Sequence, residues 1–159
     1  MGLFSFIQKA VMPDPQPVEE QDREFKKEVY PVRGAHYFTE NIMKLAVRNE
    51  EWQATKETLK SKCGLPARVF RYNFINKPVK LVPDPKNKHD KNAVMVIIAG
   101  EQVGYIPAES AVHVKDIIEN HSVKYISSFI SGGDYKVVAE NDTTKLHDDV
   151  SIKVSIGYV

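Results

Sequence analysis

The sequence predicts a mainly β protein of the α+β class: a small, partly closed β-barrel of about six strands with two or three covering helices. Three observations lead to this prediction. Short runs rich in β-branched residues recur through the second half of the 159-residue chain, separated by glycine, proline and asparagine. Stretches with apolar residues at helical spacing interrupt these runs. Several short strands with few helices are typical of a small barrel or a related β fold.

The N-terminal segment, 1–27, is predicted to precede the folded domain. Residues 1–12 carry apolar residues at helical spacing and could form a short amphipathic helix. The stretch "PDPQPVEEQDRE" follows, with three prolines and then acidic residues, which is typical of an extended linker. We therefore place the folded domain at 28–159.

The first predicted strand, 28–38, reads "EVYPVRGAHYF". Its proline favours an edge position, and its glycine favours a bulge or a close approach of another group to the backbone. A helical insertion is predicted at about 39–63, with a break near Asn49. Thr39 is expected to cap its first helix, and Gly64 is expected to end its last one.

Most of the remaining chain is predicted to be strand. Four strands are expected near 67–73, 78–83, 93–98 and 102–106. Pro107 opens a helix that extends to about Asn120, with apolar residues on one face. A second hairpin is expected to turn at Gly132-Gly133. The hairpin, the loop after it and the last strand are expected at 123–140, 142–149 and 150–159.

Composition limits the function classes. Cys63 is the only cysteine, which excludes an internal disulfide and a multi-cysteine zinc site and fits a cytoplasmic location. No apolar run approaches the roughly 18 residues of a membrane span. The formal net charge of +1 argues against a large nucleic-acid footprint. However, residues 56–91 contain ten Lys or Arg and three Asp or Glu, which is compatible with either a local phosphate-facing surface or a solvated face.

The loop 84–92 clusters polar side chains directly before an apolar strand. An EF-hand calcium site is excluded because Lys86 and Lys88 occupy ligand positions. Metal chemistry at His89 and Asp90 is disfavoured because neighbouring His or Cys ligands are missing. Two interpretations remain. The Asn and Asp side chains can bond to backbone N–H groups and build a turn, and they can also form the lip of a binding site.

The stretch "LVPDPKNKHDKNAVMVIIAGEQVGYIP", 81–107, resembles the signature of the HIRAN family. The similarity extends over roughly 30–139, with "VRGAHYF" (32–38) resembling the family's first strand and "ISSFISGGDYKVV" (126–138) its late hairpin. The resemblance implies an OB-like barrel that binds nucleic acid. In the best understood members, the ligand is the 3′ end of single-stranded DNA.

Matched motif by motif, the resemblance implies a set of nucleic-acid-binding residues. These are His36, Tyr37, Lys86, Asn87, Lys88, His89, Asp90, Lys91, Tyr105 and Tyr135. Asp90 would accept a hydrogen bond from the terminal 3′-hydroxyl, His36 would contact phosphate, and Tyr37 would stack on a base. Two positions depart from the family pattern: His36 replaces an arginine, and Ala108 replaces a lysine. We therefore expect either binding that is weaker and more sensitive to salt, or a different ligand.

We therefore predict a non-catalytic module, without metal or cofactor, that recognises single-stranded nucleic-acid ends, with DNA preferred over RNA. The sequence has no G-x-x-x-x-G-K-[ST] phosphate loop, so a motor activity would require a protein partner such as a helicase or a nuclease. One alternative is a protein-interaction adaptor that docks through residues 1–12. A hydrolase is disfavoured because no paired acid and base are evident.

Overall fold

The computed structural model describes residues 23–159, so the predicted amphipathic segment 1–12 lies outside the described residues. The described chain contains three antiparallel sheets. The largest has the order β1 (Lys26–Pro31), β9 (Thr143–Tyr158), β8 (Val123–Val138) and β3 (Ala67–Phe70). The second has the order β5 (Val79–Pro83), β6 (Val94–Ile98) and β7 (Glu101–Tyr105), and the third pairs β2 (Ala46–Arg48) with β4 (Tyr72–Phe74).

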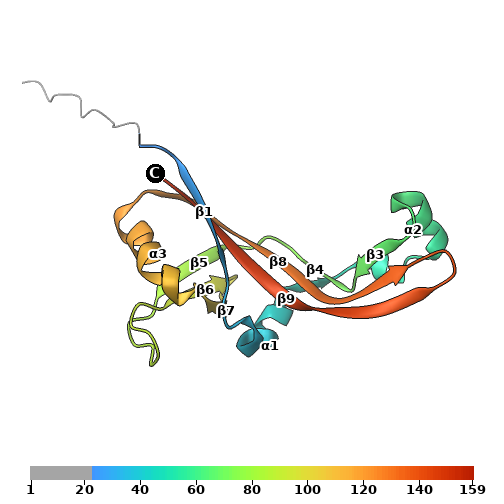
Figure 1. Cartoon of the computed structure of the whole chain (residues 1–159), viewed down its shortest axis with the longest axis horizontal. Helices are drawn as coiled ribbons and strands as arrows, with labels where there is room; N and C mark the ends of the chain where they lie inside the picture. The colour runs from blue at the N-terminus through green and yellow to red at the C-terminus, as the bar shows by residue number, and fades with distance from the viewer. Residues whose placement is uncertain (1–22) are drawn as a thin grey trace, which may run out of the picture.

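The helices are short compared with the long β8–β9 hairpin. They are α1 (Thr39–Lys44), α2 (Lys56–Cys63) and α3 (Ala108–Asn120), with the 3₁₀ turns η1 (Ala35–Phe38) and η2 (Glu50–Gln53). The β8–β9 hairpin runs along the length of the molecule (Figure 1). α3 and the β5–β7 sheet lie at one end of it, and α2 and β3 lie at the other. We call these ends the α3 lobe and the α2 lobe.

Each lobe has its own apolar cluster. In the α3 lobe, β9 alternates strictly: Ile152, Val154 and Ile156 point inward and are almost fully buried, packed with the β5–β7 sheet and one face of α3. In the α2 lobe, a smaller cluster joins Leu59 of α2 to buried residues of β3 and β8. The two clusters share no residue, so the hairpin is the main connection between two separately packed regions.

The mainly β, α+β class is confirmed, but the predicted barrel is wrong for the described chain. The three sheets do not close on one another. Local predictions held best in the β5–β7 sheet, where all three strands lie where the sequence placed them. Ala99 and Gly100 make the tight turn between β6 and β7, with φ of 49° and 83°. A two-residue turn of this kind matches the right-handed twist of its strands. The helix after Pro107 is also confirmed.

The predicted second hairpin at Gly132-Gly133 is wrong. β8 continues through both glycines, and the pairing with β9 shifts register there, from Ser131 opposite Ser151 to Gly133 opposite Asp148. The glycines therefore form a bulge and not a turn, with φ of 109° and 90°. The chain reverses only after Ala139, so the stretch 142–149, which we expected to be a loop, belongs largely to β9.

The segment 28–63 differs from its prediction in two ways. The first strand ends at Pro31, and η1 follows Gly34, whose φ is 74°. Thr39 does not cap α1, because its hydroxyl donates back to the carbonyl of His36. The predicted break near Asn49 is confirmed. Its side chain accepts a hydrogen bond from the N–H of Glu51, and β2 and η2 separate α1 from α2.

Among residues 23–159, no helix has the length and apolar character needed to cross a membrane.

The side chain of Glu28 links β1 to β9 and α3 in the α3 lobe through hydrogen bonds. Its carboxylate accepts hydrogen bonds from the hydroxyls of Tyr30 and Tyr158, the latter at 2.6 Å, and lies 3.0 Å from Nε2 of His113 on α3. Partial burial alone would raise the pKa of Glu28. The hydrogen bonds from Tyr158, Tyr30 and His113 outweigh burial and lower this pKa to about 2. The ionised carboxylate is therefore the form that the folded protein stabilises.

Glu28→Gln is expected to lower the free energy of unfolding at pH 7 by about 2 kcal/mol, because an ionised acceptor of several hydrogen bonds is lost. The folded-state pKa lies below the ordinary value of 4.5, so this stabilisation is fully present above pH 4.5 and is lost as the pH falls towards 2. Urea unfolding at pH 7 and pH 3 measures the difference. Glu119→Gln, on the exposed side of α3, is the control. A stability difference that does not change with pH would contradict this assignment.

Candidate functional site

The loop 84–92 holds its own shape through side-chain hydrogen bonds. Oδ1 of Asn87 accepts from the N–H groups of His89 and Asp90 at 2.9 and 3.1 Å, and its Nδ2 donates to Asp84. Oδ1 of Asp90 accepts from the N–H of Asn92 at 2.8 Å. The turn interpretation is therefore confirmed, and the side-chain oxygen of Asn87 is engaged within the loop.

The same loop keeps several polar groups free. Of the two carboxylate oxygens of Asp90, only Oδ1 has a hydrogen-bond partner in the described chain, and Oδ2 remains available. The imidazole of His89 is exposed. Three exposed lysines that form no ion pair with residues 23–159 flank it: Lys86, Lys88 and Lys91. The loop thus presents one carboxylate oxygen among cations.

The segment that precedes α1 presents an aromatic ring to solvent. Tyr37 is 79% exposed, and its ring centroid lies 3.9 Å from that of His36. The left-handed conformation of Gly34 starts η1, which carries both side chains. We expected these residues on a strand, but the tight turn leaves them more exposed than a central strand would. An exposed ring beside an imidazole can stack on a planar ligand.

Tyr105 of β7 connects this segment to the sheet that carries the loop. Tyr105 and Arg33 exchange both backbone hydrogen bonds, at 2.8 and 2.9 Å, and the Tyr105 ring lies 6.2 Å from that of Phe38. One residue later, the N–H of Ile106 donates to the carbonyl of Val94, where the loop joins β6. In Figure 1, η1 with α1 and the loop between β5 and β6 lie on either side of β7.

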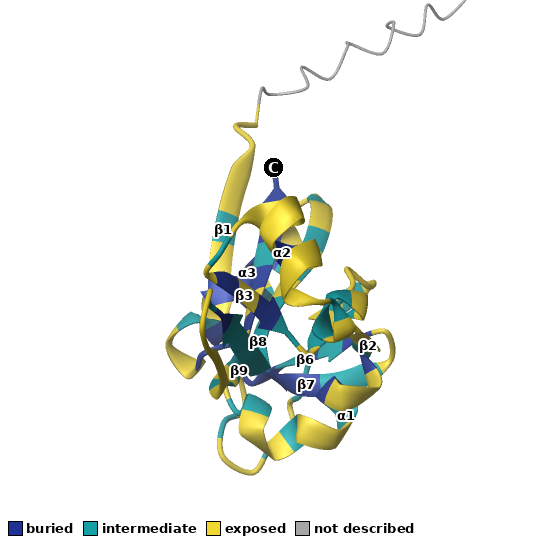
Figure 2. Cartoon of the chain, turned by 90° about the vertical axis from the view of Figure 1, so that its right-hand side faces the viewer, coloured by how far each residue is buried: buried dark blue, intermediate teal, exposed yellow. Residues whose placement is uncertain are grey.

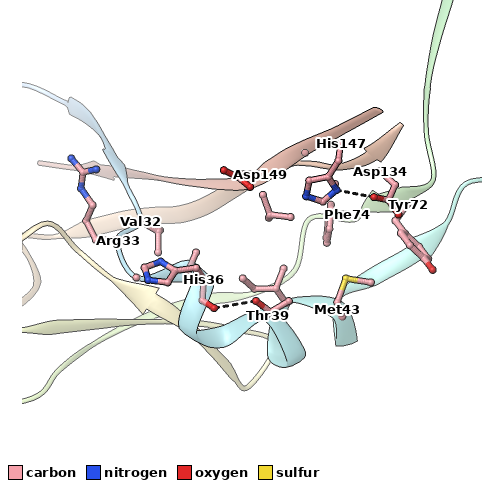
Figure 3. A pocket seen from close by; sticks show the side chains of 16 residues that line it. Val32, Arg33, His36, Thr39, Met43, Tyr72, Phe74, Asp134, His147 and Asp149 are labelled. Atoms are coloured by element: carbon pink, nitrogen blue, oxygen red, sulfur yellow. Dashed lines mark hydrogen bonds and ion pairs between the residues drawn. The ribbon is translucent and has the colours of Figure 1, made fainter. Parts of the chain in front are cut away.

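A groove of about 660 Å³ opens beside η1, towards β4 and the bulged part of the β8–β9 hairpin. Its polar side chains include Arg33, His36, Asp134 and His147 (Figure 3). Nδ1 of His147 lies 2.7 Å from Oδ1 of Asp134, and this hydrogen bond lowers the pKa of the Asp134 carboxyl. His36 is the only residue of the predicted set that lines this groove.

The sequence did not indicate the other groove residues. Tyr72 and Phe74 come from β4, and Asp134 and His147 come from the two strands of the long hairpin. They meet because the bulge shifts the register of β8 against β9. Since the glycine pair was interpreted as a turn, this meeting could not have been predicted. Arg33 carries a detectable signal, because it lies within the predicted first strand and directly precedes Gly34.

Tyr135 lies in the α2 lobe and not near the loop. It pairs with Phe70 of β3, with ring centroids 5.3 Å apart, and the guanidinium of Arg68 lies 4.0 Å above its ring. Arg68 also forms an ion pair with Asp148. β3 and the loop 84–92 lie at opposite ends of the molecule (Figure 1). The structure therefore does not bring Tyr135 together with the other predicted residues.

The basic stretch 56–91 divides between the two lobes. In the α2 lobe its cations are largely paired: Lys60 with Glu140, Lys62 with Glu51, Arg68 with Asp148 and Arg71 with Asp134. In the α3 lobe, the loop lysines form no such pairs with the described residues. The loop therefore carries a cluster of three unpaired lysines available to an anionic ligand, and Lys77 and Lys80 before it are also exposed and form no ion pair among the described residues.

The comparisons with known proteins agree with the motifs in the loop and in β5–β7. Residues 64–156 match the HIRAN domain, a DNA-binding domain. The fold is also similar to the crystal structure of the HIRAN domain of human HLTF, with 21% sequence identity and a TM-score of 0.42, covering 83% of this chain and 74% of that one. No curated protein matches. The family match spans more than half of the chain and includes the loop 84–92 and β7. The chain therefore belongs to the HIRAN domain family.

Proposed function

We propose that this protein is a non-catalytic module that binds the 3′ end of single-stranded DNA across β7, between η1 and the loop 84–92. The observation that carries the proposal is that only one of the two carboxylate oxygens of Asp90 accepts a hydrogen bond from the described residues. One of its oxygens accepts a hydrogen bond within the loop, and the other has no hydrogen-bond partner among the described residues, in a loop that also carries Lys86, Lys88 and Lys91.

A free carboxylate oxygen distinguishes a strand end from the interior of a strand. The terminal 3′-hydroxyl can donate a hydrogen bond to Asp90, whereas the corresponding oxygen of an internal nucleotide is esterified and has no proton to donate. An internal nucleotide would instead bring a negatively charged phosphate towards the carboxylate, which costs free energy. The same group therefore attracts the end and repels the interior.

The neighbouring residues supply contacts that do not depend on sequence. A base can stack on the exposed ring of Tyr37, at about 1–3 kcal/mol per base. The lysines of the loop can neutralise phosphates, which makes binding dependent on salt. Arg33, held by its backbone hydrogen bonds to Tyr105, is exposed and can supply the positive charge that His36 provides less strongly than an arginine.

Asp90→Asn tests the proposal. Asparagine retains an acceptor for the N–H of Asn92, so the loop is expected to keep its shape while the charged acceptor is lost. The wild-type protein is expected to prefer a 3′-hydroxyl over a 3′-phosphate by about tenfold or more, and Asp90→Asn is expected to bring this ratio close to one. Fluorescence anisotropy with labelled single strands at two salt concentrations measures both affinities.

Asp142→Asn is the matched control. It makes the same substitution at an exposed carboxylate in the α2 lobe, next to the hairpin turn, and is expected to leave the preference unchanged. Equal affinity of the wild-type protein for the two ends, or no binding at low salt, would overturn the proposal.

A further inference from the structure

The largest sheet has a second face that no described element covers. In β1 and in the parts of β8 and β9 that lie between the bulge and the C-terminus, 125–131 and 151–158, the even-numbered residues point into the α3 lobe, so the odd-numbered residues point outward. We call this surface the outer sheet face, formed by Lys27, Val29, Tyr125, Ser127, Phe129 and Lys153. All six are exposed, and Figure 2 shows β1 as a largely exposed strand along one side of the chain.

Two aromatic rings lie on this face. Phe129 is 65% exposed and Tyr125 is 38% exposed. The Tyr125 ring lies against Gly157 of β9, where a Cβ atom would be only 2.3 Å from it, and Phe25 lies beside it with ring centroids 6.3 Å apart. Tyr125 and Phe129 are four positions apart on one strand, which places them about 13 Å apart.

Each exposed ring shares a cross-strand row with a lysine. Phe129 is paired with Lys153 on the neighbouring strand, and Tyr125 lies in the row that runs through Gly157 to Lys27. The side chains between the rows are Val29 and serines, and none of the outward residues in 27–31, 125–131 and 151–157 is Asp or Glu. A repeated pairing of a ring with a cation, without carboxylates, is complementary to a stacked, negatively charged strand.

We propose that the outer sheet face is a second binding surface for single-stranded nucleic acid, on which bases stack on Tyr125 and Phe129 while Lys27 and Lys153 neutralise the backbone. The surface continues into the first site, because the outward residues of β1 lead through Pro31 to Arg33, directly before η1. The inference rests on the proposed function in one respect: a strand whose end lies at the loop would continue across this face.

The charge on the face favours nucleic acid over the other possible occupants. A second copy of this chain placed on the same face would bring Lys27 and Lys153 towards their own copies, with no carboxylate on the face to compensate. The exposed hydroxyl of Ser127 between the rings also distinguishes the face from a continuous apolar docking surface.

The test compares two lengths of thymidine strand with a 3′-hydroxyl, about 4 and about 12 nucleotides, which bracket the span of one small binding domain. Phe129→Ala is expected to weaken binding of the long strand about tenfold and to leave the short strand unchanged. Phe129→Leu keeps apolar surface without a ring and is expected to lose affinity similarly, whereas Phe129→Tyr is expected to retain it. Lys153→Gln is expected to reduce the slope of log affinity against log salt by about 0.7 for the long strand.

Val112→Ala, at an apolar side chain of similar exposure on α3, is the control and is expected to bind both strands as the wild type does. Long-strand affinities of Phe129→Ala and Phe129→Leu within twofold of the wild type would overturn the inference. An equal loss for both lengths would overturn it as well. So would self-association that Phe129→Ala abolishes without changing strand affinity. The preference for a 3′-hydroxyl is measured separately, so failure of the end-binding proposal and failure of this one are distinguishable.

Discussion

Gly104→Ala is expected to lower the free energy of unfolding by about 3 kcal/mol and to abolish strand binding at the loop. Gly104 lies on β7 with φ of 154°, and a Cβ atom there would be 2.5 Å from the carbonyl oxygen of Arg33 and 2.5 Å from Cγ1 of Val32. The backbone of Arg33 cannot retreat without breaking its two hydrogen bonds to Tyr105. The clash therefore separates η1 from β7.

Thermal unfolding and strand binding measure the two consequences. A loss of about 3 kcal/mol corresponds to a fall in Tm of about 6–12 °C for a chain of this size. Gly100→Ala is the matched control, because Gly100 also has a positive φ, of 83°, but a Cβ atom there would meet nothing within 4 Å. Its expected cost is about 1 kcal/mol, with binding retained. Similar effects of the two substitutions would show that backbone strain, and not the approach of Arg33, makes Gly104 necessary.

The β5–β7 sheet could be predicted from the sequence because its determinants are local. Each strand pairs with its neighbour along the chain, the two-residue turn at Ala99-Gly100 has a short sequence signal, and the strand alternation fixes the buried face. The hydrogen bonds made by the side chain of Asn87 are local as well, since all of its partners lie within three residues. Asn and Asp side chains that bond to nearby N–H groups have a recognisable spacing.

The long hairpin could not be predicted in the same way. Two glycines in a β-rich stretch are compatible with a turn or a bulge, and the choice depends on β9, whose pairing residues lie 15 positions or more away. Once Gly132-Gly133 is a bulge, Tyr135 moves to the α2 lobe, next to Phe70, and Asp134 meets His147 at the groove. One ambiguous dipeptide thus accounts for both the misplaced Tyr135 and the missed groove residues.

The contact between Arg33 and Tyr105 shows a different limit. Both residues are visible in the sequence, and each stands beside a glycine, Gly34 and Gly104. What the sequence does not reveal is that one glycine starts η1 while the other allows the backbone of Arg33 to approach β7. In a sequence, the close packing of two backbones is visible only as a glycine. Many glycines occur for other structural reasons, so the glycine alone does not identify such a contact.

Leu59→Ala is expected to unfold the α2 lobe locally while the α3 lobe stays folded. Leu59 is 1% exposed and packs with Ala67, Val69 and Val138 in the smaller apolar cluster. Truncating a buried leucine typically costs about 2–5 kcal/mol, and a cluster with so few buried side chains has little stability to lose. Because this cluster shares no residue with that of the α3 lobe, the loss is expected to remain local.

Amide hydrogen exchange distinguishes local from global unfolding. In Leu59→Ala, the amides of α2 and β3 are expected to lose protection, while those of α3 and β5–β7 keep it. Ile117→Ala, at a fully buried residue of α3, is the control, and is expected to lower the protection of α3 and β5–β7. The short thymidine strand should still bind Leu59→Ala, because the loop, β7 and η1 belong to the other lobe. A uniform loss of protection in Leu59→Ala would instead show that the β8–β9 hairpin couples the two lobes into one cooperative unit. Strand binding at the loop 84–92 would then depend on residues at the opposite end of the molecule.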